Sequence, residues 1–222
     1  MKLDLTGGKE KKQYTEADLI PSGTQEARCI GVADLGTTDT FYEGAPTGKA
    51  RFIRVFFECP DYQVKYKPFG QDEEIDGPRV IHQDFKVVGG DKSNLTKLFI
   101  SWFGSSDNAD TSRMVGRPAM VTVIHKTDAK GQVWANIGKG GIAMMPEKYV
   151  STLAPQHNKD LSFSIDENGF DSEEYKRQWP STKKKIAESY EFKKYESGPP
   201  QDPSKAHVEG SIPFNDENDL PY

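Results

Sequence analysis

Residues 93–104, SNLTKLFISWFG, decide the fold because they form the clearest helical pattern in a chain whose other apolar segments alternate like strands. Ser93 or Asn94 is a suitable N-cap, and Gly104 is a typical C-terminal residue of a helix. Four apolar side chains recur at i, i+3, i+4 and i+7 and share one stripe: Leu95, Leu98, Phe99 and Trp102. This pattern predicts one amphipathic helix whose apolar face, with Trp102, packs into a core.

Strand-like segments lie on both sides of this helix. Three precede it and two follow it, at residues 26–35, 50–58, 79–88, 119–126 and 132–137, the last running on to 144. Three strands, one helix and two strands is the element order of the OB-fold, in which the helix lies between strands 3 and 4. We therefore predict a mainly β protein built on a five-stranded OB-fold Greek-key barrel. A curled open sheet with the helix on one face is the alternative.

Changes in composition divide the chain into four parts. Residues 1–20 are polar and Lys-rich and predict a flexible arm, and residues 21–150 form the OB-fold domain. Residues 151–196 predict a helical extension, in which Pro180 can start a helix with Ile186 and Tyr190 on one face. Residues 197–222 are rich in proline and acids and poor in apolar residues, so we expect a disordered acidic tail.

Charge and cysteine usage limit the classes of partner and compartment. The net charge of the 222 residues is −5, and the tail from residue 197 carries −4 of it, so the body is nearly neutral and can still hold a local basic groove. Cys29 and Cys59 lie in apolar segments and predict two buried thiols in a reducing compartment. No apolar run is long enough to span a membrane, and the N-terminus lacks an apolar signal core, which favours the cytoplasm.

Motifs of enzymes and cofactor sites are not found in the sequence. Gly138-Lys139-Gly140-Gly141 is glycine-rich but follows a strand without opening a helix, unlike a phosphate-binding loop. The four histidines show no metal-ligand spacing. We therefore predict a protein without enzymatic activity, cofactor or metal.

The second strand carries the residues that suggest a ligand. Phe52, Arg54 and Phe56 alternate onto one face, and because Arg54 is hard to bury, we expect this face to be open to solvent. Aromatic rings stack on unpaired bases, and a guanidinium neutralises phosphate. OB-folds bind oligonucleotides through strands 2 and 3 and adjoining loops. The face predicts a single-stranded DNA-binding surface. The alternative is that the C-terminal extension covers it and the rings are core.

Further candidates for the DNA-binding surface are basic and aromatic residues on nearby strands and loops. They are Lys65, Tyr66 and Lys67 in a polar loop, Arg79, His82 and Lys86 on the third strand, and Trp134 on the fifth. For the loop and third-strand residues the alternative is a solvated surface, and for Trp134 it is a core ring. Phe41 and Tyr42 are expected to be exposed in a loop.

The end of the chain predicts a docking peptide for other proteins. Acids at Asp216, Glu217 and Asp219 lead into Leu220, Pro221 and Tyr222. The apolar and aromatic side chains can fill a pocket while the acids and the terminal carboxylate meet a basic rim. This tip resembles the C-terminal tips of bacterial-type single-stranded DNA-binding proteins, which recruit replication and repair partners. A solvated acidic terminus is the alternative.

Several blocks, in order and spacing, resemble the bacteriophage single-stranded DNA-binding proteins of the OB-fold type. They are residues 21–36 (PSGTQEARCIGVADLG), 76–81 (DGPRVI), 92–95 (KSNL) with Ser101-Trp102, 116–118 (GRP) and 134–137 (WANI). The resemblance covers about residues 20–150. It implies non-enzymatic, largely sequence-independent binding of single-stranded DNA in phage replication or recombination.

This chain departs from the family at Thr96 and Phe103, where family members carry basic residues. A DNA-contacting role for the helix is therefore not implied. A structural or adaptor protein that binds other proteins through its β-domain is the alternative function, and self-association is open under either.

Overall fold

The computed structural model describes residues 19–66 and 73–198. The sheet and its helix comprise β1 (Gly23–Tyr42), β2 (Ala45–Tyr66), β3 (Ile75–Lys86), α1 (Asn94–Phe103), β4 (Pro118–Thr127) and β5 (Val133–Met144), with a 3-10 turn, η2 (Thr111–Arg113). The helices that follow are α2 (Glu147–Val150), α3 (Ile165–Asn168), α4 (Glu173–Arg177), α5 (Pro180–Ala187) and α6 (Tyr190–Glu196). The predicted order of three strands, one helix and two strands is confirmed. The predicted N-terminal arm, apart from its last two residues, and the acidic tail, apart from its first two, lie outside the described residues.

The five strands form one antiparallel sheet in the order β3-β2-β1-β4-β5. β1 pairs with β4 over residues 23–28 and with β2 from residue 28 to 42, so this long strand passes from one neighbour to the other. β3 and β5 are the edges of the sheet and contact each other, but no strand pairing joins them in residues 19–66 and 73–198. The sheet is therefore open along this seam, and its closure into an OB-fold barrel stays a prediction.

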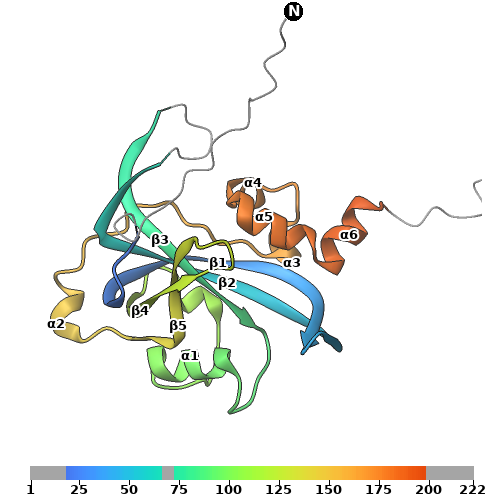
Figure 1. Cartoon of the computed structure of the whole chain (residues 1–222), viewed down its shortest axis with the longest axis horizontal. Coiled ribbons are helices and arrows are strands. Elements are labelled where there is room, and N and C mark those ends of the chain that lie inside the picture. Colours follow the sequence, from blue (N-terminus) through green and yellow to red (C-terminus); the bar gives the residue numbers. More distant parts are fainter. Residues whose placement is uncertain (1–18, 67–72, 199–222) are drawn as a thin grey trace, which may run out of the picture.

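One side of the sheet packs on α1 (Figure 1). The Ser93 hydroxyl caps this helix by accepting hydrogen bonds from Leu95 N and Thr96 N, and Gly104 ends it in the left-handed region with φ of 81°. Trp102 is fully buried, and its indole N–H donates to the carbonyl of Pro118 at 2.8 Å. The predicted cap, stop and buried stripe are confirmed.

The predicted cysteine thiols lie in the same core. Cys29 and Cys59 are buried and free, as the sequence predicts. Burial raises the pKa of each thiol to about 12. Neither thiol is therefore ionised near neutral pH.

The other side of the sheet is covered by the C-terminal extension, with α3 to α6 (Figure 1). This second core is formed by apolar side chains from β1, β2 and the extension: Ile30, Ala33, Leu35, Phe56, Leu161, Phe163 and Ile186. The helix predicted to begin at Pro180 is present as α5, in which Ile186 is fully buried. The prediction that Tyr190 shares a face with Ile186 is wrong, because α5 ends at Ala187 and Tyr190 begins α6. The sheet is thus the middle of three layers.

The extension also pairs with β1 beyond residue 28, where pairing with β4 has ended. Leu161 N donates to Ile30 O at 2.9 Å, and Asp34 N donates to Phe163 O at 2.8 Å. Gly31 lies between these contacts, where a Cβ atom would stand 2.6 Å from the carbonyl carbon of Leu161. A side chain at this position would therefore push the extension away from the sheet.

We expect Gly31→Ala to lower the free energy of unfolding by about 1–3 kcal/mol, because the added methyl overlaps backbone that cannot rotate away. Gly89→Ala is the matched control, since a Cβ at Gly89 meets no atom within 4 Å. Urea unfolding of both variants measures the difference. Equal stability of the two variants would contradict this account of the docking.

Candidate nucleic-acid interface

The face that carries Phe52, Arg54 and Phe56 is not open to solvent, so that prediction is wrong. Phe56 is 0% exposed and Arg54 is 3% exposed, while Phe52 is partly buried against the same core. The edge of the Trp179 ring packs on Phe56, with ring centroids 5.7 Å apart. The alternative, in which the C-terminal extension covers these rings, is confirmed.

Arg54 can be buried because each of the three guanidinium nitrogens donates a hydrogen bond. It donates to both carboxylate oxygens of Asp84, at 2.6 and 3.0 Å, and to the Thr182 hydroxyl at 3.1 Å. The Lys185 ammonium lies 3.1 Å from the same carboxylate. Burial of Asp84 opposes its ionisation, but the hydrogen bonds and positive charges of Arg54 and Lys185 together outweigh burial and lower the pKa of Asp84. A phosphate would have to displace Asp84 to reach Arg54.

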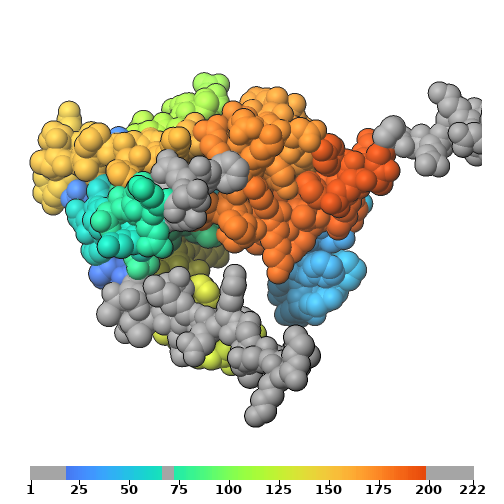
Figure 2. Space-filling model, turned by 90° about the horizontal axis from the view of Figure 1, so that it is seen from above, coloured from blue at the N-terminus to red at the C-terminus, as the bar shows by residue number. Residues whose placement is uncertain are grey.

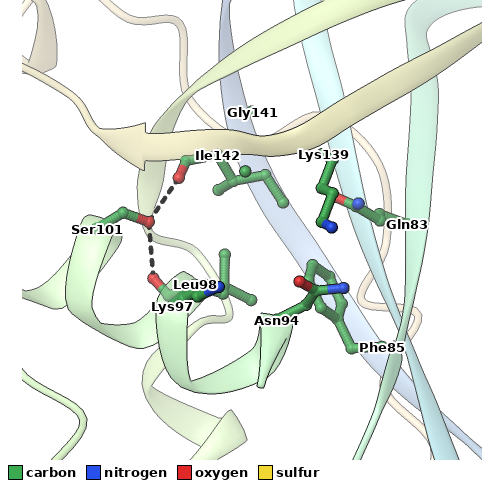
Figure 3. A pocket seen from close by; sticks show the side chains of 10 residues that line it. Gln83, Phe85, Asn94, Lys97, Leu98, Ser101, Lys139, Gly141 and Ile142 are labelled. Carbon is green, nitrogen blue, oxygen red and sulfur yellow. Dashed lines mark hydrogen bonds between the residues drawn. The ribbon is translucent and has the colours of Figure 1, made fainter. Parts of the chain in front are cut away.

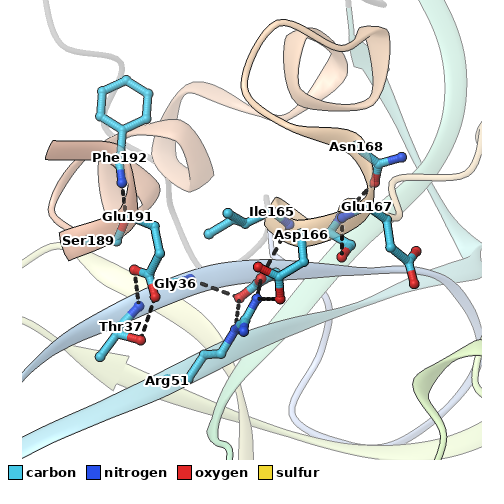
Figure 4. Close-up of polar contacts among 12 residues, drawn as sticks. Gly36, Thr37, Arg51, Ile165, Asp166, Glu167, Asn168, Ser189, Glu191 and Phe192 are labelled. Atoms are coloured by element: carbon cyan, nitrogen blue, oxygen red, sulfur yellow. Dashed lines mark hydrogen bonds and ion pairs between the residues drawn. The ribbon is translucent and has the colours of Figure 1, made fainter. Parts of the chain in front are cut away.

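A second polar cluster holds the extension at its other end (Figure 4). Arg51 donates to Asp34 and, at 2.7 Å, to Asp166 of α3, and its hydrogen bonds to Asp34 raise the pKa of Arg51. Glu191 of α6 accepts from the backbone N–H and hydroxyl of Thr37 at 2.8 and 2.6 Å. These contacts join β1 and β2 to α3 and α6 of the extension, so the covering layer is specifically attached.

The predicted residues of β3 lie at different depths. His82 is partly buried with its ring 6.0 Å from that of Phe56, and Lys86 is exposed opposite Phe52. Burial and the nearby charge of Arg54 lower the pKa of His82 to about 4, so this imidazole is neutral near pH 7. His82 therefore adds no charge to a DNA-binding surface at that pH.

The predicted polar loop is partly strand. Lys65 and Tyr66 belong to β2, with Lys65 exposed and Tyr66 partly buried, and Tyr66 and Arg79 line one pocket. Lys67 lies outside the described residues, as do all residues of the predicted docking tip. The structure thus brings together two of the predicted residues, Tyr66 and Arg79, away from Phe52 and Lys86.

The tryptophan of β5 is half exposed, at 48%, and is not a core ring. Its indole N–H donates to the Asp128 carboxylate at 3.1 Å, and the pairing of β4 with β5 places it opposite Lys126. Asp128 also accepts from Lys130 N and Gln132 N, which forms the predicted hairpin turn. Trp134 is therefore a fixed ring beside a lysine.

The most exposed rings of the described protein are Phe41 and Tyr42, at 65% and 69%. They end β1 instead of lying in a loop, because Glu43 and Gly44 form a two-residue turn with φ values of 50° and 82°. The Lys49 ammonium of β2 lies 3.7 Å from the centre of the Tyr190 ring of α6. Figure 2 shows this hairpin projecting beside the C-terminal helices.

The glycine-rich segment after Ile137 forms a bulge instead of a phosphate-binding loop. The pairing of β4 with β5 shifts between Val121 and Val123, and a Cβ at Gly141 would stand 2.9 Å from the carbonyl oxygen of Gly138. The bulge borders a pocket of about 290 Å³ at the seam between β3 and β5 (Figure 3). Its floor is apolar, and Lys97 and Lys139 stand at its edge. The bulge therefore lies beside the gap between β3 and β5.

No family model, curated protein or solved structure matches this chain. In the described part of the chain, none of the helices has the length and apolar character needed to cross a membrane. Over the same residues, no cluster of three or more His, Cys, Asp or Glu side chains is placed to hold a metal ion.

We expect stability to fall as pH is lowered from about 6.5 to about 4, because His82 binds a proton readily only after unfolding. Within this window the contribution is about 1.4 kcal/mol per pH unit. Urea unfolding of the wild type and of His82→Gln between pH 7 and pH 4 measures it, and the variant should lose less stability. Parallel losses in the two proteins would contradict burial of a neutral His82.

Proposed function

We propose that this protein binds single-stranded DNA without enzymatic activity and largely without regard to sequence, and that its sheet and α1 form an OB-fold domain. The strand order β3-β2-β1-β4-β5, with α1 between β3 and β4, supports this assignment, because it is the order of a partly open five-stranded Greek-key barrel. In OB-folds the loops that join strands 1 to 2 and 4 to 5 contact oligonucleotides.

The observation that carries the proposal is the exposure of Phe41, Tyr42 and Trp134 on these two hairpins. Each exposed ring can stack on a base, which contributes roughly 1–3 kcal/mol per base regardless of base type. Lys126 lies opposite Trp134 in the β4–β5 hairpin, and Lys49 belongs to the β1–β2 hairpin, where its ammonium packs on the Tyr190 ring. Both lysines can neutralise phosphates. The proposed surface therefore uses the hairpins in place of the covered centre of β2 and β3.

The rest of the proposal follows from the resemblance of the sequence. We propose a role in phage DNA replication or recombination, with the tip at Asp216, Glu217, Asp219, Leu220, Pro221 and Tyr222 recruiting partner proteins. Its apolar and acidic residues suit a pocket with a basic rim.

Burial of Phe56 and Arg54 favours a second candidate function. The face of strands 2 and 3 that binds ligands in OB-folds is occupied here by the extension. A structural or adaptor protein that binds other proteins through its hairpins would have the same covered face. DNA binding distinguishes the two functions.

We expect Phe41→Ala, Tyr42→Ala and Trp134→Ala each to weaken binding to oligo-dT by about five-fold or more, because each removes a stacking ring. Fluorescence anisotropy of a labelled oligonucleotide at several salt concentrations measures the affinity, which should fall as salt rises. Tyr149→Ala is the matched control, since it removes an exposed ring of α2. Failure of the wild-type protein to bind oligo-dT at low salt would favour the adaptor function.

Deletion of residues 216–222 should leave the affinity for oligo-dT unchanged or raise it, because the deletion removes three acids that repel or compete with phosphate. The same anisotropy titration measures the effect. A marked loss of affinity on deletion would place the tip in the DNA-binding surface and contradict its role as a separate docking peptide.

A further inference from the structure

A pocket of about 280 Å³ lies where the end of the β2–β3 ribbon meets the C-terminal extension. Val64, Pro78 and Val80 give it apolar walls, and the rings of Tyr66 and Trp179 border it together with Arg79. This volume lies at the lower end of the range for small-molecule sites and suits one planar group with a short polar substituent.

Tyr66 is held in place before any ligand binds. Its hydroxyl donates to the Asn158 side-chain oxygen at 2.7 Å, and a Cβ at Gly77 would stand 2.7 Å from the edge of its ring. Asn158 is fixed in turn, because its backbone N–H and its side-chain NH₂ each donate to the buried carboxylate of Glu58 at 2.9 Å. The ring thus requires no ordering when a base stacks on it.

Trp179 is fixed from the opposite layer. It precedes α5 as its N-cap residue with extended φ and ψ of −64° and 152°, and its ring meets that of Phe56 edge-on at 69°. Its indole N–H has no hydrogen-bond partner in residues 19–66 and 73–198. Phe56, predicted to stack on DNA itself, instead supports a ring that borders the pocket.

Arg79 differs from the two arginines of β2 that the extension covers. Arg51 and Arg54 are each paired with carboxylates, whereas Arg79 is partly buried and has no ion pair or hydrogen bond within the described part of the chain. A guanidinium that is partly desolvated without a counter-charge is a strong site for an anion. Two rings and a free guanidinium together match the base and the phosphate of one nucleotide.

We propose that this pocket holds one unpaired nucleotide of a bound DNA strand, with its base against the Tyr66 and Trp179 rings and its phosphate at Arg79. The proposal rests on the proposed function and extends it, because the pocket lies at the opposite end of β2 from Phe41 and Tyr42. The extension is then part of the DNA-binding surface and not only its cover.

The test uses the full-length protein and an oligo-dT of about 30 residues, longer than the site size of a single OB-fold. Arg79→Gln should weaken binding about five- to ten-fold and lower the slope of log K against log salt by about one, because one phosphate contact is lost. Arg113→Gln is the matched control, since Arg113 is not among the residues that line the pocket and its guanidinium contacts nearby backbone carbonyls and the Phe103 ring. Arg79→Gln should unfold at the wild-type urea concentration, because among the described residues Arg79 has no hydrogen bond or ion pair to lose.

A second measurement avoids substitution in the pocket. Photocrosslinking of wild-type protein to oligo-dT that carries 5-iododeoxyuridine, followed by mass spectrometry, should recover peptides that contain Tyr66 or Trp179. Crosslinks confined to the hairpin peptides, together with wild-type affinity and salt slope in Arg79→Gln, would overturn the pocket and leave the proposed function intact. Failure of the wild type to bind oligo-dT would overturn both.

Discussion

The buried guanidinium of Arg54 is the constraint on which the outer layer depends. A charged side chain on a sheet face is stable beneath a second layer only when it is paired and its hydrogen bonds are satisfied. Asp84 on the neighbouring strand supplies the pair, and Thr182 of α5 supplies a further acceptor. Lys185, from the same helix, adds a second cation to Asp84. α5 therefore completes the polar cluster that it covers, which makes its position on the sheet specific.

Docking of the extension determines which parts of β2 a ligand can reach. The middle of the strand is sealed beneath α5, whereas its first and last residues extend past the covering helices. The extension also places a ring near each end, with Tyr190 under the Lys49 ammonium and Trp179 in the pocket that Val64 and Tyr66 line. The same packed layer thus contacts both ends of β2. A DNA strand bound at both proposed surfaces would therefore meet a preorganised protein.

Local signals explain which features could be predicted from the sequence. The N-cap, apolar stripe and C-terminal glycine of α1 all lie within residues 93–104, and the burial of Trp102 follows from them. Covering of Phe56 could not be predicted in the same way, because alternation of Phe and Arg is the same whether the outer face meets water or another layer. The deciding partner of Arg54, Thr182, is 128 residues away. The covering of Phe56 is therefore seen only in the long-range packing of the structure.

The hairpin of β1 and β2 is a case in which the residue composition predicted a loop and the structure has a strand. Glycine, threonine and proline in residues 36–49 predict a loop, yet pairing continues to the Glu43-Gly44 turn because both turn residues adopt positive φ. The hairpin consequently projects beside the C-terminal helices, and Phe41 and Tyr42 at its tip remain mostly exposed. Single exposed apolar residues are ordinary, but two adjacent rings at a projecting tip form a patch. The proposed stacking on unpaired bases would account for the exposure of this patch.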